Sequence, residues 1–320
     1  GSSGSGGGQS SNSGTTLSLA AAGAGSGNDI TNTVSVDLTI ATLIADDDIV
    51  VQAVETAKIT ADAGGVAITK TQSGGVAISI GAAVAINNIG DTVAVTITDS
   101  DLTAGGDITI AAREASTIDA LALVGAFTLS SGGGGNDGGT SSGFEFSGAG
   151  AVTINTITNT VTVELDALSV LNAGNAVTMV ANDVSAINAD AGAVALGLAL
   201  DQSSATIAAA AAAAVNRVEN TTTSTVIGTT ITSGGLTTVG AASAALVTVF
   251  ALGVAGAISL GTSQSGGGGV SFAGAGSGAG NTIDNNTHAT LVGGTLNVAD
   301  LSVTSVDSAI IAADAGGVAI

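Results

Sequence analysis

The sequence predicts an all-β protein, a parallel β-helix (β-solenoid) of about five repeat units. Three observations lead to this fold class: a composition suited to sheet, a repeat that runs along the whole chain, and short β-branched segments inside each repeat. A series of tandem small β-sandwich domains is the alternative that these observations leave open.

The composition favours sheet over helix. The 320 residues include 49 Gly and no Pro, Cys, Trp or Tyr, and 45% of them are hydrophobic. A chain without Pro keeps every backbone N–H available for a sheet ladder, whereas Gly and Thr are poor helix formers. Disordered chains are poor in Val and Ile, so we expect this chain to fold despite its glycines.

Two sequence anchors recur five times at constant spacing. The first is Asn, any residue, Ile or Val, any residue, and then Asn, Asp or a close neighbour followed by Thr, and it begins at Asn28, Asn87, Asn155, Asn216 and Asn281. The second begins 15 or 16 residues later in every unit, at Leu43, Leu102, Leu171, Ile231 and Leu296. A third and less regular anchor begins at Asp62, Asp119, Asp190, Val254 and Asp314. Such regular spacing indicates a true repeat.

The anchors indicate that 1–320 is one continuous repeat array of five units. Its units are 15–74, 75–130, 144–201, 205–263 and 270–320, and its Gly-rich loops are 1–14, 131–143 and 264–269.

Short strand-like segments fill each unit, and in the second unit these are 92–98, 107–112 and 116–123. We expect about three coils of roughly 20 residues per unit, with the Asn anchors at turns. Five units would then give about fifteen coils in a rod on the order of 70 Å.

Residues 244–261 carry no charge and are long enough to cross a bilayer. The corresponding stretch of the first unit, however, contains Asp62 and Lys70, and that of the third contains Asp190 and Asp201. The flanks also lack the Trp/Tyr belt of a membrane span. We therefore expect a buried β segment and no membrane insertion.

The charge excludes several kinds of partner. The chain has 25 Asp plus Glu against four Lys plus Arg, a net charge of −21. Four cations cannot neutralise a row of phosphates, so we expect neither nucleic acid nor an anionic membrane surface as a partner. The absence of Cys rules out disulfides and thiolate metal sites. Residues 1–14 show neither the basic nor the apolar region of a signal peptide.

Acidic residues give two candidate sites. Asp46, Asp47 and Asp48 are adjacent and could hold calcium through oxygen ligands, although a solvated turn is the simpler interpretation. Asp99 and Asp101 could share a strand face as the paired carboxylates of a polysaccharide-cleaving enzyme. Such an enzyme usually offers an aromatic platform to its sugar, and this chain has five Phe and no Trp or Tyr.

Two further features have simple interpretations. His288 is the only histidine, and we expect it in a solvated turn. The run 221–225 (TTTST) could order water as an ice-binding surface, but Thr is common in strands for its β propensity alone. We therefore assign no catalytic, cofactor-binding or metal-binding residue and expect no enzymatic activity.

The segments 159–181 and 99–112 resemble giant bacterial surface proteins of the filamentous-haemagglutinin and autotransporter-adhesin type. The resemblance implies secretion, a β-solenoid stalk and a role in adhesion, aggregation or matrix formation.

We therefore expect an extracellular structural or adhesive protein, a segment of a bacterial surface or biofilm-matrix filament. Neither end of the sequence has the polar pattern of a solenoid cap, so we expect its partners to be further repeats or copies of itself joined head to tail. A host or neighbouring cell surface is a further expected partner. A calcium- or glycan-binding adhesin module is the alternative function.

Overall fold

Each repeat unit forms one complete coil of parallel β-structure. The structure is a computed structural model that describes residues 16–72, 75–131, 143–166, 168–200, 204–260 and 269–320. The Gly-rich loops expected at 1–14, 131–143 and 264–269 lie almost wholly outside the described residues. The fold class is confirmed as an all-β parallel β-solenoid.

The first coil contains four strands, β1 (Leu17–Ile30), β2 (Thr33–Thr39), β3 (Thr42–Ala45) and β4 (Ile49–Gln72). The second and third coils repeat this order as β5 (Val76–Ile89), β6 (Thr92–Thr98), β7 (Asp101–Ala104), β8 (Ile108–Ser131), β9 (Phe144–Ile157), β10 (Thr160–Leu165), β11 (Val170–Ala173) and β12 (Val177–Ala199). In the last two coils the third and fourth strands merge, giving β13 (Ala205–Val218), β14 (Thr221–Ile227), β15 (Thr230–Ser259), β16 (Val270–Ile283), β17 (Asn286–Val292) and β18 (Thr295–Ala319).

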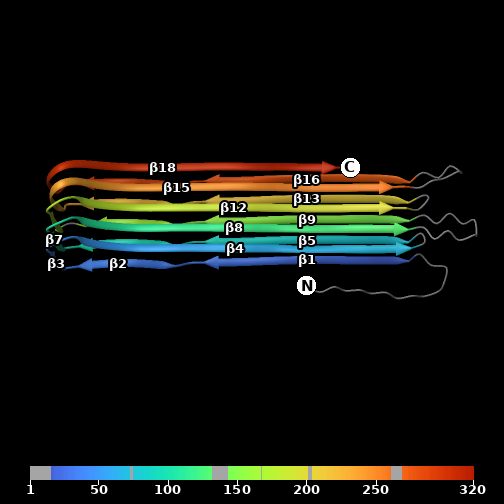
Figure 1. Cartoon of the computed structure of the whole chain (residues 1–320), viewed down its shortest axis with the longest axis horizontal. Coiled ribbons are helices and arrows are strands. Elements are labelled where there is room, and N and C mark those ends of the chain that lie inside the picture. Colours follow the sequence, from blue (N-terminus) through green and yellow to red (C-terminus); the bar gives the residue numbers. More distant parts are fainter. Residues whose placement is uncertain (1–15, 73–74, 132–142, 167, 201–203, 261–268) are drawn as a thin grey trace, which may run out of the picture.

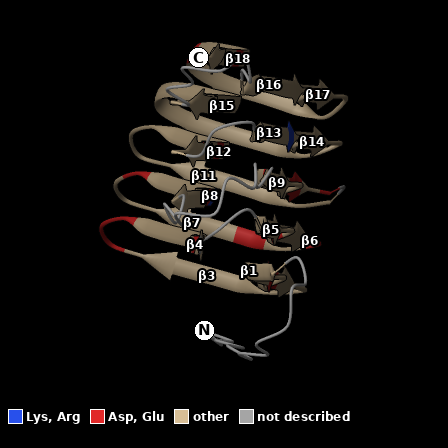
Figure 2. Ribbon diagram, turned by 90° about the vertical axis from the view of Figure 1, so that its right-hand side faces the viewer, with Lys and Arg blue, Asp and Glu red and all other residues tan. Residues whose placement is uncertain are grey.

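Three parallel sheets run through the stack of coils. The first has the order β1-β5-β9-β13-β16, the second β17-β14-β10-β6-β2, and the third contains β3, β4 and their equivalents. Figure 1 shows the first strand of each coil running opposite to the long return strand, and Figure 2 shows the coils stacked one above another. The coil is therefore flattened, with the first two sheets packed against the third.

The expectation of three coils per unit is wrong, and so is the rod of fifteen coils. Residues 107–112 and 116–123 do not form two strands, because β8 continues without a break from Ile108 to Ser131. Five coils at about 4.8 Å span only roughly 20 Å along the stack, whereas a 24-residue return strand is about 80 Å long. Tandem antiparallel sandwiches are excluded, because strands of successive units pair in parallel.

Strand register confirms the first two anchors and corrects the third. Asn28 pairs with Asn87, and Leu43 pairs with Leu102. Asp62, however, pairs with Leu121 rather than Asp119, and Phe250 rather than Val254 is the equivalent residue in the fourth coil. Asp119 is two residues and Val254 four residues from the true equivalent, and an even shift keeps the same face of a strand, so both still face outwards.

Residues 244–259 lie in β15, which confirms that this stretch is a strand. Its side chains alternate between the interior, as at Val247, and the outer face, as at Phe250, which is 49% exposed. The described residues include no helix, and so none long and apolar enough to span a membrane.

The core changes character along the coil. Around the corner formed by β2, β3 and the start of β4, it consists mainly of Val, Ile and Leu. Between the first strand and the far half of the return strand, it consists almost entirely of Ala. The two sheets come close together there, and side-chain sizes compensate across the gap: Val124 of β8 faces Gly81 of β5.

Gly253 is the clearest case of this close approach. A Cβ atom on Gly253 would lie 2.4 Å from the carbonyl oxygen of Gly276 on the facing sheet. We predict that Gly253→Ala lowers the free energy of unfolding by about 1–3 kcal/mol, because the facing backbone must move. Gly150→Ala is the matched control, because a Cβ there meets nothing within 4 Å. It should raise stability by about 0.5 kcal/mol, and equal effects in chemical denaturation would contradict the close packing.

Every coil turns its corner through left-handed backbone at one equivalent position, which in the last coil is followed by a second left-handed residue, Gly294. This position is occupied by Ile40, Asp99, Leu168, Gly228 and Gly293, with φ between 47° and 72°. Left-handed backbone costs a residue with a side chain about 1–2 kcal/mol, and a β-branched residue such as isoleucine suits it least.

We predict that Ile40→Gly raises the free energy of unfolding by roughly 0.5–1 kcal/mol, because relief of strain exceeds the entropy that glycine adds to the unfolded chain. Ile44→Gly is the control, since Ile40 and Ile44 are both 78% exposed and Ile44 lies in the ordinary strand β3. It should be destabilising by up to about 1 kcal/mol. Loss of stability in Ile40→Gly, measured by thermal unfolding, would show that the corner is not strained.

Candidate functional site

The first polar feature inside the solenoid is a ladder of asparagines. In each step the Nδ2 of one asparagine donates to the Oδ1 of its equivalent in the next coil, at 2.8 Å. The ladder comprises the first anchor in all five coils, Asn28, Asn87, Asn155, Asn216 and Asn281. These residues were expected at turns, and that expectation is wrong, because they lie inside strands. In-register stacking places identical amides within bonding distance, which satisfies groups that are otherwise costly to bury.

A second polar column follows at the turn between the first and second strands of each coil. It consists of Asn32, Asp91, Asn159, Asn220 and Asn285. In the first three steps, a side-chain oxygen accepts a bond from the backbone N–H of the coil before: Asp91 from Asn32 (2.7 Å), Asn159 from Asp91 (3.2 Å) and Asn220 from Asn159 (3.0 Å). The side-chain amide nitrogens of Asn159 and Asn220 then point across the interior.

A column of residues that is acidic in four of the five coils lies opposite, on the return strands. It consists of Glu55, Glu114, Asp183, Ser243 and Asp307, which pair in register. Amide nitrogens of the second column donate across to its carboxylates: Asn32 to Glu55 (3.0 Å), Asn159 to Glu114 (2.7 Å), Asn220 to Asp183 (2.5 Å) and Asn285 to Asp307 (2.9 Å).

The second coil departs from this pattern. It carries Asp91 where the other four coils carry asparagine. Asp91 is 1% exposed, and its Oδ2, like the Oε2 of Glu55, is buried and has no hydrogen-bond partner. Oxygens of Glu55, Asp91 and Glu114 lie within 4.8 Å of one another, the one cluster of three potential metal ligands found in the described part of the chain.

No positive side chain offsets these carboxylates. Lys58, Lys70, Arg113 and Arg217 are the only cations of the chain, and all four are exposed on the outer face. Burial raises the pKa of Glu114 to about 10, with a further contribution from Asp183. Burial also raises the pKa of Glu55 and that of Asp183. The column can therefore hold protons or a cation, and oxygen ligands of this kind suit hard ions such as calcium or magnesium.

Asp46, Asp47 and Asp48 form an exposed turn between β3 and β4. The Oδ1 of Asp48 accepts a bond from the backbone N–H of Asp107 at 2.8 Å, so this carboxylate supports the turn of the next coil. Within the described residues these three carboxylates are not part of a metal-ligand cluster.

The other sequence candidates are not brought together. Asp99 lies at the left-handed corner and Asp101 begins β7, so they do not share a strand face. His288 is exposed on strand β17, and its expected place in a turn is wrong. In the run 221–225 on β14, Thr222 and Ser224 are buried. Only every second residue of the run therefore reaches the outer face.

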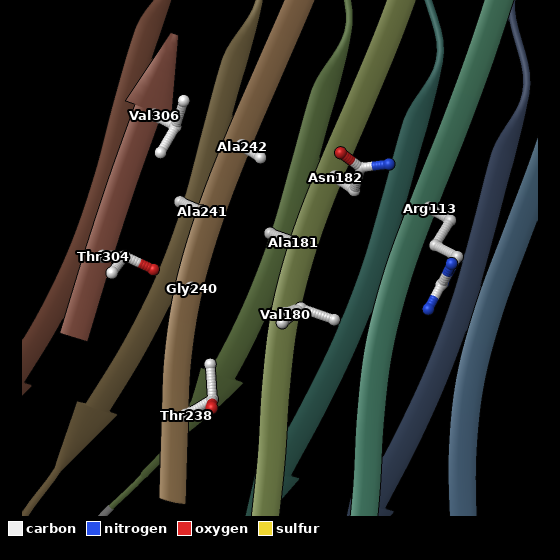
Figure 3. A pocket seen from close by; sticks show the side chains of 10 residues that line it. All are labelled: Arg113, Val180, Ala181, Asn182, Thr238, Gly240, Ala241, Ala242, Thr304 and Val306. Carbon is white, nitrogen blue, oxygen red and sulfur yellow. The ribbon is translucent and has the colours of Figure 1, made fainter. Parts of the chain in front are cut away.

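A shallow pocket on the outer face of the third sheet surrounds Gly240, which lacks a side chain between Val180 and Thr304 (Figure 3). Arg113 lies at its rim, and the remaining lining is small and mostly apolar. This pocket holds no acid–base pair or nucleophile with an activating partner, so it gives no basis for a reaction.

Comparison with protein-family models, with curated proteins and with solved structures found no match for this chain.

Sequence reasoning missed the buried carboxylates, although it identified the anchor that contains Asp91. Glu55 stands between Ala53 and Ala57, two inward-facing residues, and this alternation was the available signal.

We predict that Asn87→Leu lowers the free energy of unfolding by about 2–4 kcal/mol, because it breaks two ladder bonds and leaves the buried Oδ1 of Asn155 without its donor. Asn88→Leu is the control, because Asn88 is the next residue and bonds to Asp29 on the exposed face. It should change stability by less than about 1 kcal/mol. Similar losses for both variants in urea unfolding would show that the ladder contributes little.

Proposed function

We propose that this chain is an extracellular structural and adhesive segment, part of a bacterial surface or biofilm-matrix filament of the filamentous-haemagglutinin or autotransporter-adhesin kind. The single observation that carries the proposal is that the inward-facing residues of the last coil are uncovered. Val239 and Val247 of the fourth coil are 0% exposed, whereas their equivalents Val303 and Ile311 are 43% and 47% exposed.

Open edges of this length favour addition of another coil. The return strands β4 and β18 form the two outer edges of the third sheet, with 24 and 25 residues respectively. Such strands present unpaired backbone groups and are templates for pairing. The first and last coils also share the sequence DAGGVAI, at 62–68 and 314–320, which suits continuation in the same register. Further repeats or a second copy of the chain would cover these edges equally well.

The outer faces support a role in contact with other surfaces. Large apolar side chains stand exposed on both broad faces, among them Ile86 and Phe144 on one and Leu123 and Phe250 on the other. Exposed apolar side chains on a broad face can supply contact area for a partner. The net charge of −21 would keep such an object soluble.

The alternative function is a calcium- or glycan-binding adhesin. The buried carboxylate cluster favours calcium binding over glycan binding. For both candidates, the absence of Cys and the acidic composition are compatible with a secreted protein.

Head-to-tail assembly can be tested by placing a charge at the open edge. We expect the isolated chain to form species whose size grows with concentration in sedimentation, and filaments with strands across their axis in electron microscopy. Ile311→Lys should abolish assembly, because an added coil would bury the ammonium group. Ile310→Lys is the matched control on the outer face and should assemble as the unchanged chain does. A concentration-independent monomer, or equal behaviour of the two variants, would refute head-to-tail assembly.

A further inference from the structure

We propose that Glu55, Asp91 and Glu114 bind one hard divalent cation, best fitted by Ca²⁺, inside the solenoid between its first two coils. The site belongs to the scaffold itself, and its occupancy does not depend on the proposed adhesive role.

The decisive atom is the Oδ2 of Asp91. In Asn159 and Asn220, the Oδ1 caps a backbone N–H of the coil before, and the Nδ2 donates to an acid across the interior. The Oδ1 of Asp91 caps Asn32 in the same way, so its Oδ2 occupies the position of the amide nitrogen. An acceptor with no partner therefore stands, fully buried, where the other coils supply a donor.

The neighbouring groups are acceptors too. The Oε2 of Glu55 also lacks a partner, and oxygens of all three carboxylates lie within 4.8 Å of one another. Lone pairs that face one another in an apolar interior require a proton or a cation between them. The solenoid has no lysine or arginine directed inwards that could serve.

The surrounding hydrogen bonds hold the carboxylates in place around this position. Both oxygens of Glu114 already accept bonds, Oε1 from Ser116 and Oε2 from the Nδ2 of Asn159. The Oε1 of Glu55 accepts from Asn32. Outer donors that fix carboxylates in this manner are typical of metal centres, where they orient the ligands.

The donor set points to calcium among the hard cations. Each of the three carboxylates offers one oxygen within 4.8 Å of the others, and Ca²⁺ accepts carboxylates through one or both oxygens in irregular geometry. Mg²⁺ usually retains several waters, and the residues flanking Asp91 on the interior face, Ile89 and Val93, are 0% exposed and apolar. Glu55 belongs to the first coil and is half-buried, so the ion has a route in from the open edge.

The test is calorimetric titration of the chelator-treated full chain with CaCl₂, with MgCl₂ and MnCl₂ in parallel, together with thermal unfolding in CaCl₂ and in EDTA. We expect one Ca²⁺ per chain and a higher melting temperature with Ca²⁺. Asp91→Asn restores the amide of the other four coils and should fold, bind Ca²⁺ at least about tenfold more weakly and lose the thermal shift. In EDTA this variant should be at least as stable as the unchanged chain.

Two controls localise the site. Asp307→Asn changes an acid of the same column that already has an amide partner, and Asp47→Asn changes the exposed acidic turn. Both should bind Ca²⁺ as the unchanged chain does. If Asp91→Asn does not fold, Glu55→Gln in the first coil provides the same readout and should also lose affinity at least about tenfold.

Loss of Mg²⁺ or Mn²⁺ binding in Asp91→Asn or Glu55→Gln would equally support a cation at this site. The proposal is overturned if the unchanged chain binds none of the three ions, if Asp91→Asn or Glu55→Gln binds with unchanged affinity, or if Asp47→Asn abolishes binding instead.

Discussion

Parallel, in-register stacking of one repeat upon the next is the constraint on which the other features of this solenoid depend. Because each unit forms one coil, every side chain lies about 4.8 Å from its equivalents in the coils above and below. Each position of the repeat is therefore a column of neighbours, and its residue must suit stacking on itself. Asparagine does so well, since its amide is both donor and acceptor and continues the ladder through all five coils.

The thin alanine core follows from the flattened coil. With sheets this close, a larger side chain on one sheet requires a smaller one opposite, as with Val124 and Gly81. The chain consequently buries small residues between the sheets and carries several of its large apolar ones outside, such as Phe250 and Ile86. The 45% hydrophobic content of the chain therefore lies partly on its surface.

The sequence predicted the fold class and the first two anchors, because interior positions in register keep their spacing. It misled on coil size, because Arg113, Glu114 and Ala115 look like an interruption between two short strands, whereas β8 continues through them without a break. The third anchor was displaced at Asp119, because a position two residues away on the same outward face is equally solvated. Backbone pairing does not restrict which residue type occupies such an outward position. The carboxylate cluster was missed because its members come from two return strands and a turn that only the correct coil length brings together.

The two interior polar columns also explain why a single atom exchange matters so much. Stacked carboxylates repel one another, and the facing amides offset this by donating one or more bonds to each acid of the column, including Glu114 and Asp183. The carboxylate of Asp91 in place of an amide removes a hydrogen-bond donor and adds a negative charge at a buried position. Both changes increase the repulsion among the neighbouring carboxylates. Burying an uncompensated charge costs several kcal/mol by order of magnitude. A well-formed coil around Asp91 is therefore reconciled with its surroundings only if positive charge enters from outside the chain, because every cation of the chain faces the opposite way.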